Sequence, residues 1–222
     1  MQLFETLRLD SGKFSRLRYH YDRIKHSANQ FQMTFDDNQW HETISEIKNH
    51  YFTGTYRVKI ILYPNGIFKY EVAELPQKDS FTAKIVPLTQ IQDKRILTNK
   101  TTNRDHLAHN HETDLILLYD ESGKILEFDI GNIMIKEGDH YYTPVFNDDF
   151  LKGCKRQELI DEGELIDLTQ DKKTDEQRLK AIVLLEQAIT PKSKGGSYAA
   201  NNATAMKKLV EQALTLLNQS QL

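Results

Sequence analysis

A predicted β-hairpin in the first half of the chain constrains the fold more than any other feature. Residues 56–63 are rich in β-branched and aromatic side chains, and residues 67–72 have a similar composition. Asn65 and Gly66 stand between the two runs. Asn-Gly is a favoured two-residue hairpin turn because both residue types tolerate positive φ. The sequence therefore predicts two antiparallel strands joined by a tight turn at these residues.

The segments before the hairpin predict one strand and two helices. Leu3, Glu5 and Leu7 lie at alternate positions, as in a strand. Apolar and small residues then recur every three or four positions over residues 17–31, which is the period of an amphipathic helix. The aspartates at 36–37 offer an N-cap for a second helix. The apolar face of that helix is formed by Trp40, Ile44 and Ile47.

Short strands are expected through the middle of the chain. They are predicted at residues 81–86, 114–119, 125–128, 133–135 and 141–145. Residues 87–98 are polar and aperiodic, which is typical of a linker and divides the chain into lobes of residues 1–92 and 93–222. Helical periodicity returns at residues 176–189 and 205–217. The pattern predicts a mixed α/β protein of two lobes.

The composition excludes several classes of protein. The chain has 222 residues, with 29 Lys and Arg against 32 Asp and Glu, and a net charge of −3 argues against a dedicated nucleic-acid-binding protein. No apolar run reaches the roughly 18 residues of a membrane span, and no secretory signal is visible. Cys154 is the single cysteine, so it forms no internal disulfide and gives no zinc-ligand spacing. These features predict a cytoplasmic protein without a metal.

Lys100 is the first residue with the potential for covalent chemistry. It stands among small hydroxyl and amide residues, shortly before the predicted strand at 114–119. A buried lysine loses its proton more easily than an exposed one and can then form a Schiff base. The alternative is a solvated loop lysine, which is the common case because most lysines are exposed.

Glu127 is a carboxylate within a predicted apolar strand. Its neighbours Leu126 and Phe128 are apolar, and burying an uncompensated carboxylate is costly, so a buried Glu127 needs a partner. A protonated pyridine nitrogen would be such a partner. In the other strand orientation Glu127 faces water.

A glycine at the start of a predicted helix and an arginine on the first helix suggest a phosphate site. Gly153 precedes Cys154 and Lys155, and the free backbone N–H groups at a helix start hold phosphates well. Arg23 could supply the positive charge. Taken alone, each of these residues is equally consistent with an ordinary helix start or a surface charge.

Together these features resemble the class IV aminotransferases, also called fold-type IV pyridoxal-phosphate enzymes. Within that family the chain looks most like the lyases that act on 4-amino-4-deoxychorismate. The matching segments, in the order of the family, are residues 4–6, 20–24 with 27–28, 100–104, Glu127 with 131–133, 142–144 and 151–156. They cover residues 3 to about 160.

The resemblance implies a cofactor, pyridoxal 5′-phosphate, and a role for each motif residue. Lys100 would bond to the cofactor and act as the catalytic acid and base. Glu127 would pair with the pyridine nitrogen, and Leu151 would pack on one face of the ring. The phosphate would be bound by Arg23 and by the N–H groups of Cys154 and Lys155. Asn103 or Arg104 could approach the ring hydroxyl, a contact that the resemblance leaves open.

The resemblance also implies a fold and an activity. The fold would have an N-terminal α/β sandwich lobe and a strand-rich, pseudo-barrel C-terminal lobe, in a homodimer. The reaction would convert aminodeoxychorismate into 4-aminobenzoate and pyruvate in folate biosynthesis, with Thr6 and Arg57 as substrate contacts. Amino transfer to branched-chain or D-amino acids, or a non-catalytic role, stays open. The C-terminus is atypical, because residues 181–190 lack the Asn-Ser pair of relatives.

Overall fold

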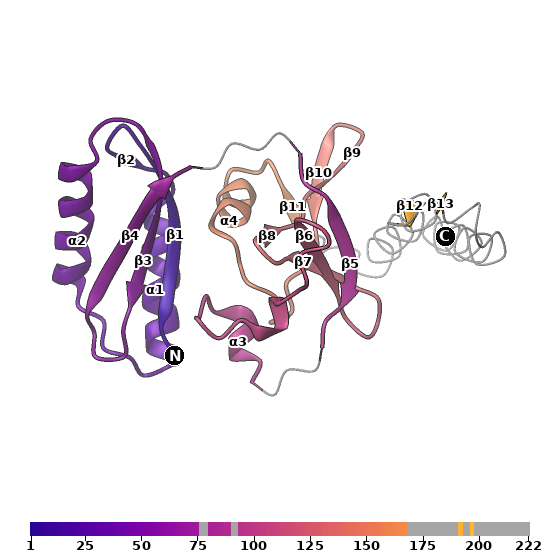
Figure 1. Ribbon diagram of the computed structural model, residues 1–222, viewed down its shortest axis with the longest axis horizontal. Helices are drawn as coiled ribbons and strands as arrows, with labels where there is room; N and C mark the ends of the chain where they lie inside the picture. Colours follow the sequence, from indigo (N-terminus) through magenta and orange to yellow (C-terminus); the bar gives the residue numbers. More distant parts are fainter. Residues whose placement is uncertain (76–79, 90–92, 168–190, 193–195, 198–222) are drawn as a thin grey trace.

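The computed structural model describes residues 1–75, 80–89 and 93–167, together with a pair of two-residue strands, β12 (Pro191–Lys192) and β13 (Gly196–Ser197). The helices expected at 176–189 and 205–217 and the atypical stretch at 181–190 lie outside the described residues. The described part contains both helices and β-sheets, as the sequence predicts (Figure 1).

The first sheet is built around the predicted hairpin. Its four strands have the order β2 (Lys13–Phe14), β1 (Leu3–Asp10), β3 (Thr55–Leu62) and β4 (Phe68–Glu74), and all neighbours are antiparallel. The turn between β3 and β4 contains Gly66 at φ 85°, a conformation that glycine adopts without strain. The predicted hairpin is therefore confirmed, and its first strand pairs with the strand predicted around Leu3 and Leu7. The two-residue turn is not: the Tyr63 N–H donates to the Ile67 carbonyl and closes a three-residue loop, 64–66, in which only Gly66 has a positive φ.

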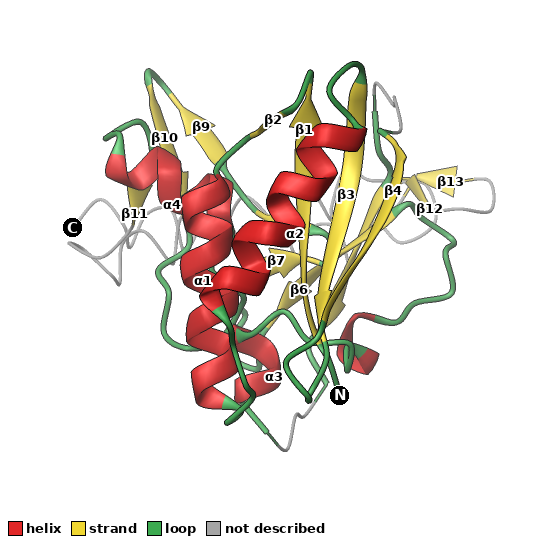
Figure 2. Ribbon diagram, turned by 90° about the vertical axis from the view of Figure 1, so that its left-hand side faces the viewer, coloured by secondary structure: helices red, strands yellow, loops and turns green. Residues whose placement is uncertain are grey.

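Two helices cover one face of this sheet, α1 (Leu17–Gln30) and α2 (Asp37–His50) (Figure 2). Asp36 is the N-cap of α2, and its side chain accepts hydrogen bonds from the backbone N–H groups of Asn38 and Gln39. These bonds satisfy donors that have no partner inside the helix. Both predicted helices and the predicted cap are confirmed.

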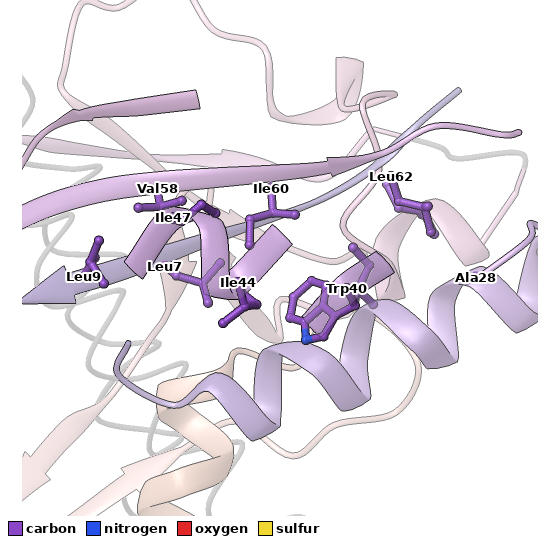
Figure 3. Close-up of a cluster of buried hydrophobic side chains, with 11 residues drawn as sticks. Leu7, Leu9, Ala28, Trp40, Ile44, Ile47, Val58, Ile60 and Leu62 are labelled. Atoms are coloured by element: carbon purple, nitrogen blue, oxygen red, sulfur yellow. The ribbon is translucent and has the colours of Figure 1, made fainter. Parts of the chain in front are cut away.

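The main hydrophobic core lies between these helices and the sheet (Figure 3). Trp40 is only 1% exposed and packs edge-on against Phe68. The buried members of the core are Leu3, Leu7, Leu9, Ile24, Ala28, Trp40, Ile44, Ile47, Val58, Ile60 and Leu62. Because successive side chains of a strand point to opposite faces, the even-numbered residues of β1 face the second lobe.

Residues 83–167 contain two small sheets, in addition to the pair formed by β12 and β13. In the first, β5 (Ala83–Pro87) runs parallel to β6 (Leu115–Tyr119), which continues to β7 (Ile125–Phe128) and β8 (Gly131–Asn132). The second has the order β11 (Ile166–Asp167), β10 (His140–Thr143) and β9 (Ile135–Glu137). The helical segments are α3 (Arg95–Thr98), a 3₁₀ turn at Asp105–Leu107, and α4 (Cys154–Asp161).

Two expectations for this half need correction. The single strand expected at 133–135 is replaced by β8 and β9, with residues 133–134 between them. The predicted linker at 87–98 contains the short helix α3. Periodicity could not reveal either feature, because a two-residue strand or a single helical turn is too short to show a repeat. No helix in the described residues is both long and apolar enough to cross a bilayer.

The strand pairing favours a different division of the chain from the one expected at residue 92. β5 lies before that boundary, yet it pairs with β6 in the second half. Sheet partners so distant in sequence are set by tertiary packing, which local patterns do not reveal. We therefore propose that the two lobes divide between β4 and β5.

Replacing Asp36 by alanine should destabilise the protein by about 1 kcal/mol, because two N–H groups of α2 lose their acceptor. Urea denaturation at pH 7 measures this loss. Asn38→Ala is the matched control, since it keeps the capping bond to its own N–H. Equal stability of the two variants would contradict the capping role.

Candidate functional site

A cavity of about 410 Å³ lies between the two lobes, within the size range of small-molecule sites. Every predicted cofactor-binding residue lines it. Those residues are Arg23, Lys100, Glu127, Leu151, Cys154 and Lys155. The structure thus brings together side chains from α1, the segment after α3, β7 and the start of α4.

Lys100 is held in place by backbone pairing with the first strand. The Phe4 N–H donates to the Lys100 carbonyl at 3.0 Å, Leu3 pairs with Thr101 across an isolated β-bridge, and the Thr102 N–H donates to the Gln2 carbonyl at 2.9 Å. Residues 100–102 therefore extend the edge of the first sheet. This pairing fixes the position from which the Lys100 side chain enters the cavity.

The Lys100 amine is suited to give up its proton. Burial, followed by the positive charge of Arg23, lowers the pKa of Lys100 to about 8. Its Nζ lies 5.3 Å from the centre of the Phe4 ring and forms no ion pair or hydrogen bond with any described residue. A partly neutral amine facing a cavity is available for bonding to an aldehyde or for proton transfer.

Glu127 faces the same cavity from β7 and is 3% exposed. Its Oε1 accepts the Leu151 N–H at 3.1 Å, and Asn132 Nδ2 approaches Oε2 at 3.4 Å. Burial raises the pKa of Glu127 to about 7, although the Leu151 N–H and the charge of Arg104 act in the opposite direction. Of the two orientations considered from the sequence, the buried one is observed.

A second buried carboxylate, Glu5, binds Arg23 in a two-point ion pair. Arg23 Nε donates to Oε1 at 2.8 Å and the terminal NH2 donates to Oε2 at 2.5 Å. His20 Nδ1 lies 2.7 Å from the same Oε2. Burial alone would raise the pKa of Glu5, but the charge and hydrogen bonds of Arg23 and those of His20 outweigh it and lower the pKa to about 2.

The same arginine joins the two lobes. Its NH1 group donates to the Lys152 carbonyl at 2.8 Å, immediately before α4. Two further contacts tie α1 to α4: Arg16 NH1 to Glu158 Oε2 at 3.3 Å, and the Tyr19 hydroxyl to Asp161 Oδ2 at 2.9 Å. Side chains of α1 and of its N-cap residue Arg16 therefore hold the first lobe against the start of the second.

The start of α4 provides unpaired backbone donors. The first N–H groups of a helix, here those of Cys154 and Lys155, have no acceptor within it. Asn132 Oδ1 accepts the Gly153 N–H at 2.7 Å, and a Cβ at Gly153 would collide with that oxygen. Glycine at 153 therefore lets the backbone approach Asn132, and Cys154 and Lys155 line the same cavity as Arg23.

The two predicted substrate contacts differ in position. Thr6 lies on the face of β1 directed to the second lobe and lines the cavity. Arg57 does not: it is exposed and pairs with Arg8, two positions further along the sheet than the pair of Thr6 with Lys59. The structure does not bring Arg57 to this cavity, because strand alternation gives the face of a side chain but not the extent of the cavity. Its role as a substrate contact stays a prediction.

Three residues near the site, Glu5, His20 and Asn132, were given no individual role from the sequence, whereas Arg104 was named as one of two candidate contacts of the ring hydroxyl. Glu5 stands at a core-facing position of an apolar strand, a signal of the same kind as that for Glu127. His20 and Asn132 gave no separate signal, since their partners are distant in sequence. The Arg104 guanidinium lines the cavity and forms no ion pair or hydrogen bond with a described residue. Burial lowers its pKa, while the charge of Glu127 acts to raise it.

Glu5, His20 and Cys154 also place three potential metal-ligand atoms within 4.8 Å of one another. Both oxygens of Glu5 already accept bonds from Arg23, and burial raises the pKa of the Cys154 thiol to about 12. A guanidinium beside a protonated thiol disfavours a metal ion. We interpret the cluster as part of the ion-pair network.

Comparison with known proteins identifies the family. The model of the amino-transferase class IV family matches residues 2–186. The chain belongs to this family. Its members depend on pyridoxal phosphate, and the family fold agrees with the two-lobed class IV fold expected from the sequence motifs. No curated protein sequence matches the chain.

Solved structures share the fold. A candidate 4-amino-4-deoxychorismate lyase from Haemophilus somnus 129PT is 24% identical, with 75% of this chain and 86% of that chain covered at a TM-score of 0.63. A candidate amino-acid aminotransferase from Mesorhizobium loti is 25% identical, with 75% and 85% covered and a TM-score of 0.64. A hypothetical aminotransferase from Mycobacterium tuberculosis, with α-ketoglutarate and pyridoxamine phosphate bound, is 16% identical (74% and 69% covered, TM-score 0.63).

Glu5→Gln should destabilise the protein by about 3 kcal/mol at pH 7, because the pKa of Glu5 is about 2 in the folded protein and 4.5 for an ordinary glutamate. This contribution is present above the unfolded pKa near 4.5 and is lost as pH falls toward 2. The stability gap between variant and parent, measured by urea denaturation, should therefore shrink below pH 4.5.

Glu127→Gln is the matched control, because burial raises the pKa of Glu127 whereas the pKa of Glu5 is lowered. Its raised pKa means that the ionised form is unfavourable in the fold, so this variant should not lose stability at pH 8. Equal losses in both variants would contradict the assigned electrostatics.

Proposed function

We propose that the protein is a pyridoxal-phosphate-dependent lyase that converts 4-amino-4-deoxychorismate into 4-aminobenzoate and pyruvate, a reaction of folate biosynthesis. Membership of the class IV family supports the cofactor class. The solved lyase candidate from H. somnus has the same fold. The observation that carries the proposal is the guanidinium of Arg104, which has no partner among the described residues and lies in a cavity that also holds Lys100 and Glu127.

The residues of the cavity fit the cofactor. Arg23 and the unpaired N–H groups of Cys154 and Lys155 form an anion site at one end, to which we assign the phosphate. Leu151 is buried at the wall and would contact the ring. We assign Glu127 to the ring nitrogen, because its carboxylate would pair with that nitrogen and keep it protonated. Lys100 Nζ, without a described partner, is the amine to which the aldehyde would bond.

The chemistry then divides between the cofactor and the chain. When bound, pyridoxal phosphate supplies an electron sink that stabilises negative charge next to the substrate nitrogen. Lys100 Nζ removes the proton from the substrate ring carbon that bears the nitrogen, a task for which a pKa of about 8 is well placed. The electron pair left by that proton is then used to expel the enolpyruvyl oxygen, so the C–O bond breaks and the ring becomes aromatic. The released enolate takes a proton, which the Lys100 ammonium group can return, and becomes pyruvate.

Positive charge in the cavity suits a substrate with two carboxylates. Arg23 is engaged by Glu5 and assigned to the phosphate, whereas the Arg104 guanidinium is unpaired among the described residues. We assign Arg104 to a substrate carboxylate and Thr6 to a hydrogen bond with the substrate. The sequence expectation of a cytoplasmic homodimer is retained as part of this proposal.

Amino transfer is the second candidate, and a single observation favours it. The M. loti aminotransferase candidate is as similar to this chain as the lyase candidate is. A transaminase of branched-chain or D-amino acids would use the same Lys100 and Glu127. A non-catalytic role is less well supported, since all six proposed cofactor-binding residues line one cavity.

Lys100→Ala should abolish the visible absorbance of protein reconstituted with pyridoxal phosphate, because the amine that bonds to the aldehyde is absent. Absorbance spectra after removal of free cofactor measure this. Lys136→Ala, on the exposed strand β9, is the control and should retain the band. A parent protein that remains colourless would contradict the cofactor assignment.

The holoenzyme should release pyruvate and 4-aminobenzoate from aminodeoxychorismate in a coupled assay. Arg104→Gln should lower kcat/KM by about tenfold or more, the size expected for losing a charged hydrogen bond, while the cofactor band remains. Arg8→Gln, an exposed residue paired with Asp10, is the control. Amino transfer to 2-oxo acids without lyase turnover would overturn the first choice.

A further inference from the structure

A second cavity, of about 490 Å³, lies against Arg23 and is larger than the candidate site. The two cavities share only Arg23 and Cys154. The second is bounded by one face of α1, by residues 98–99, by the loop before α4 and by α4 itself. Lys100, Glu127 and Arg104 do not line it, so a ligand there would not contact the residues to which we assign proton transfer, the ring nitrogen and the substrate carboxylate.

Two polar side chains in its lining each have an oxygen without a hydrogen-bond partner among the described residues. Ser27 is 3% exposed, and its hydroxyl forms no hydrogen bond with any described residue. Asn99 is 2% exposed; its Nδ2 donates to Gln30 Oε1 at 2.6 Å, but its Oδ1 accepts nothing from the described residues. Both side chains line the cavity, so these two oxygens are open to it and available for hydrogen bonds with a polar ligand.

Charges of both signs surround the cavity in equal number. The cations are Arg18, Arg23 and Lys152, and the carboxylates are Asp22, Asp148 and Asp161. Lys152 Nζ lies 4.1 Å from the centre of the Phe146 ring and has no carboxylate partner among the residues described. Asp148 likewise makes no ion pair with the described chain. A purely anionic or purely cationic ligand would be repelled by one of these two groups.

We propose that this second cavity binds a free α-amino acid. The ligand carboxylate pairs with Lys152 and its ammonium group pairs with Asp148. A polar ligand side chain reaches Ser27 and Asn99, where one donor and one acceptor are unused. The overall neutrality of a zwitterion matches the balanced charge of the lining.

Calorimetric titration of the full-length protein with each of the twenty L-amino acids tests the proposal. At least one should bind saturably, whereas acetate and methylamine, each with one of the two charges, should not. Lys152→Met, Asp148→Asn and Ser27→Ala should each weaken binding about tenfold or more. Lys152→Met keeps the carbonyl that Arg23 uses, and asparagine tolerates the φ of 56° at Asp148.

Two control variants test whether the amino acid binds in the second cavity. Lys136→Met removes an exposed lysine that lies over Tyr141, outside both cavities, and should leave the affinity unchanged. Lys100→Ala alters only the candidate site and should also leave it unchanged. The proposal is overturned if no amino acid binds, if the affinity is unaffected by Lys152→Met or Asp148→Asn, or if it is lost in Lys100→Ala. Both surface variants remain informative should Ser27→Ala fail to fold.

Discussion

The ion pair between Glu5 and Arg23 is the interaction on which the candidate site depends. It joins β1 to α1 in the interior of the first lobe, and the same guanidinium holds the Lys152 carbonyl of the second lobe. Removing one partner from a buried pair leaves an uncompensated charge and costs several kcal/mol. One arginine therefore fixes the packing of a lobe, the contact between lobes and the charge at one end of the cavity.

The electrostatics of the cavity follow from this arrangement. Arg23 is kept charged by Glu5, and its charge adds to burial in lowering the pKa of Lys100. Glu127 lies in a similarly buried position but receives no two-point partner from the chain, so its pKa rises to about 7. Two carboxylates with opposite shifts in one site mark different tasks: Glu5 is structural, whereas Glu127 faces the cavity with a proton to share.

The sequence predicted what short-range rules control. The turn at Asn65 and Gly66 and the cap at Asp36 depend on neighbours within a few residues, and both are found. Lys100 and Glu127 were singled out from their local settings and the motif order, and the structure brings them to one cavity; their roles stay predictions. The pairing of Glu5 with Arg23 and of β5 with β6 depends on tertiary packing, which no local pattern encodes.

The account rests most directly on the bond between Lys100 and the cofactor. Protein incubated with pyridoxal phosphate, reduced with borohydride, digested and analysed by mass spectrometry reveals which lysine carries the label. We expect the phosphopyridoxyl group on the peptide that contains Lys100, because this amine faces the cavity with a lowered pKa and no described ion-pair partner. A label confined to other lysines, or no label at all, would contradict the assignment of this cavity as the cofactor site.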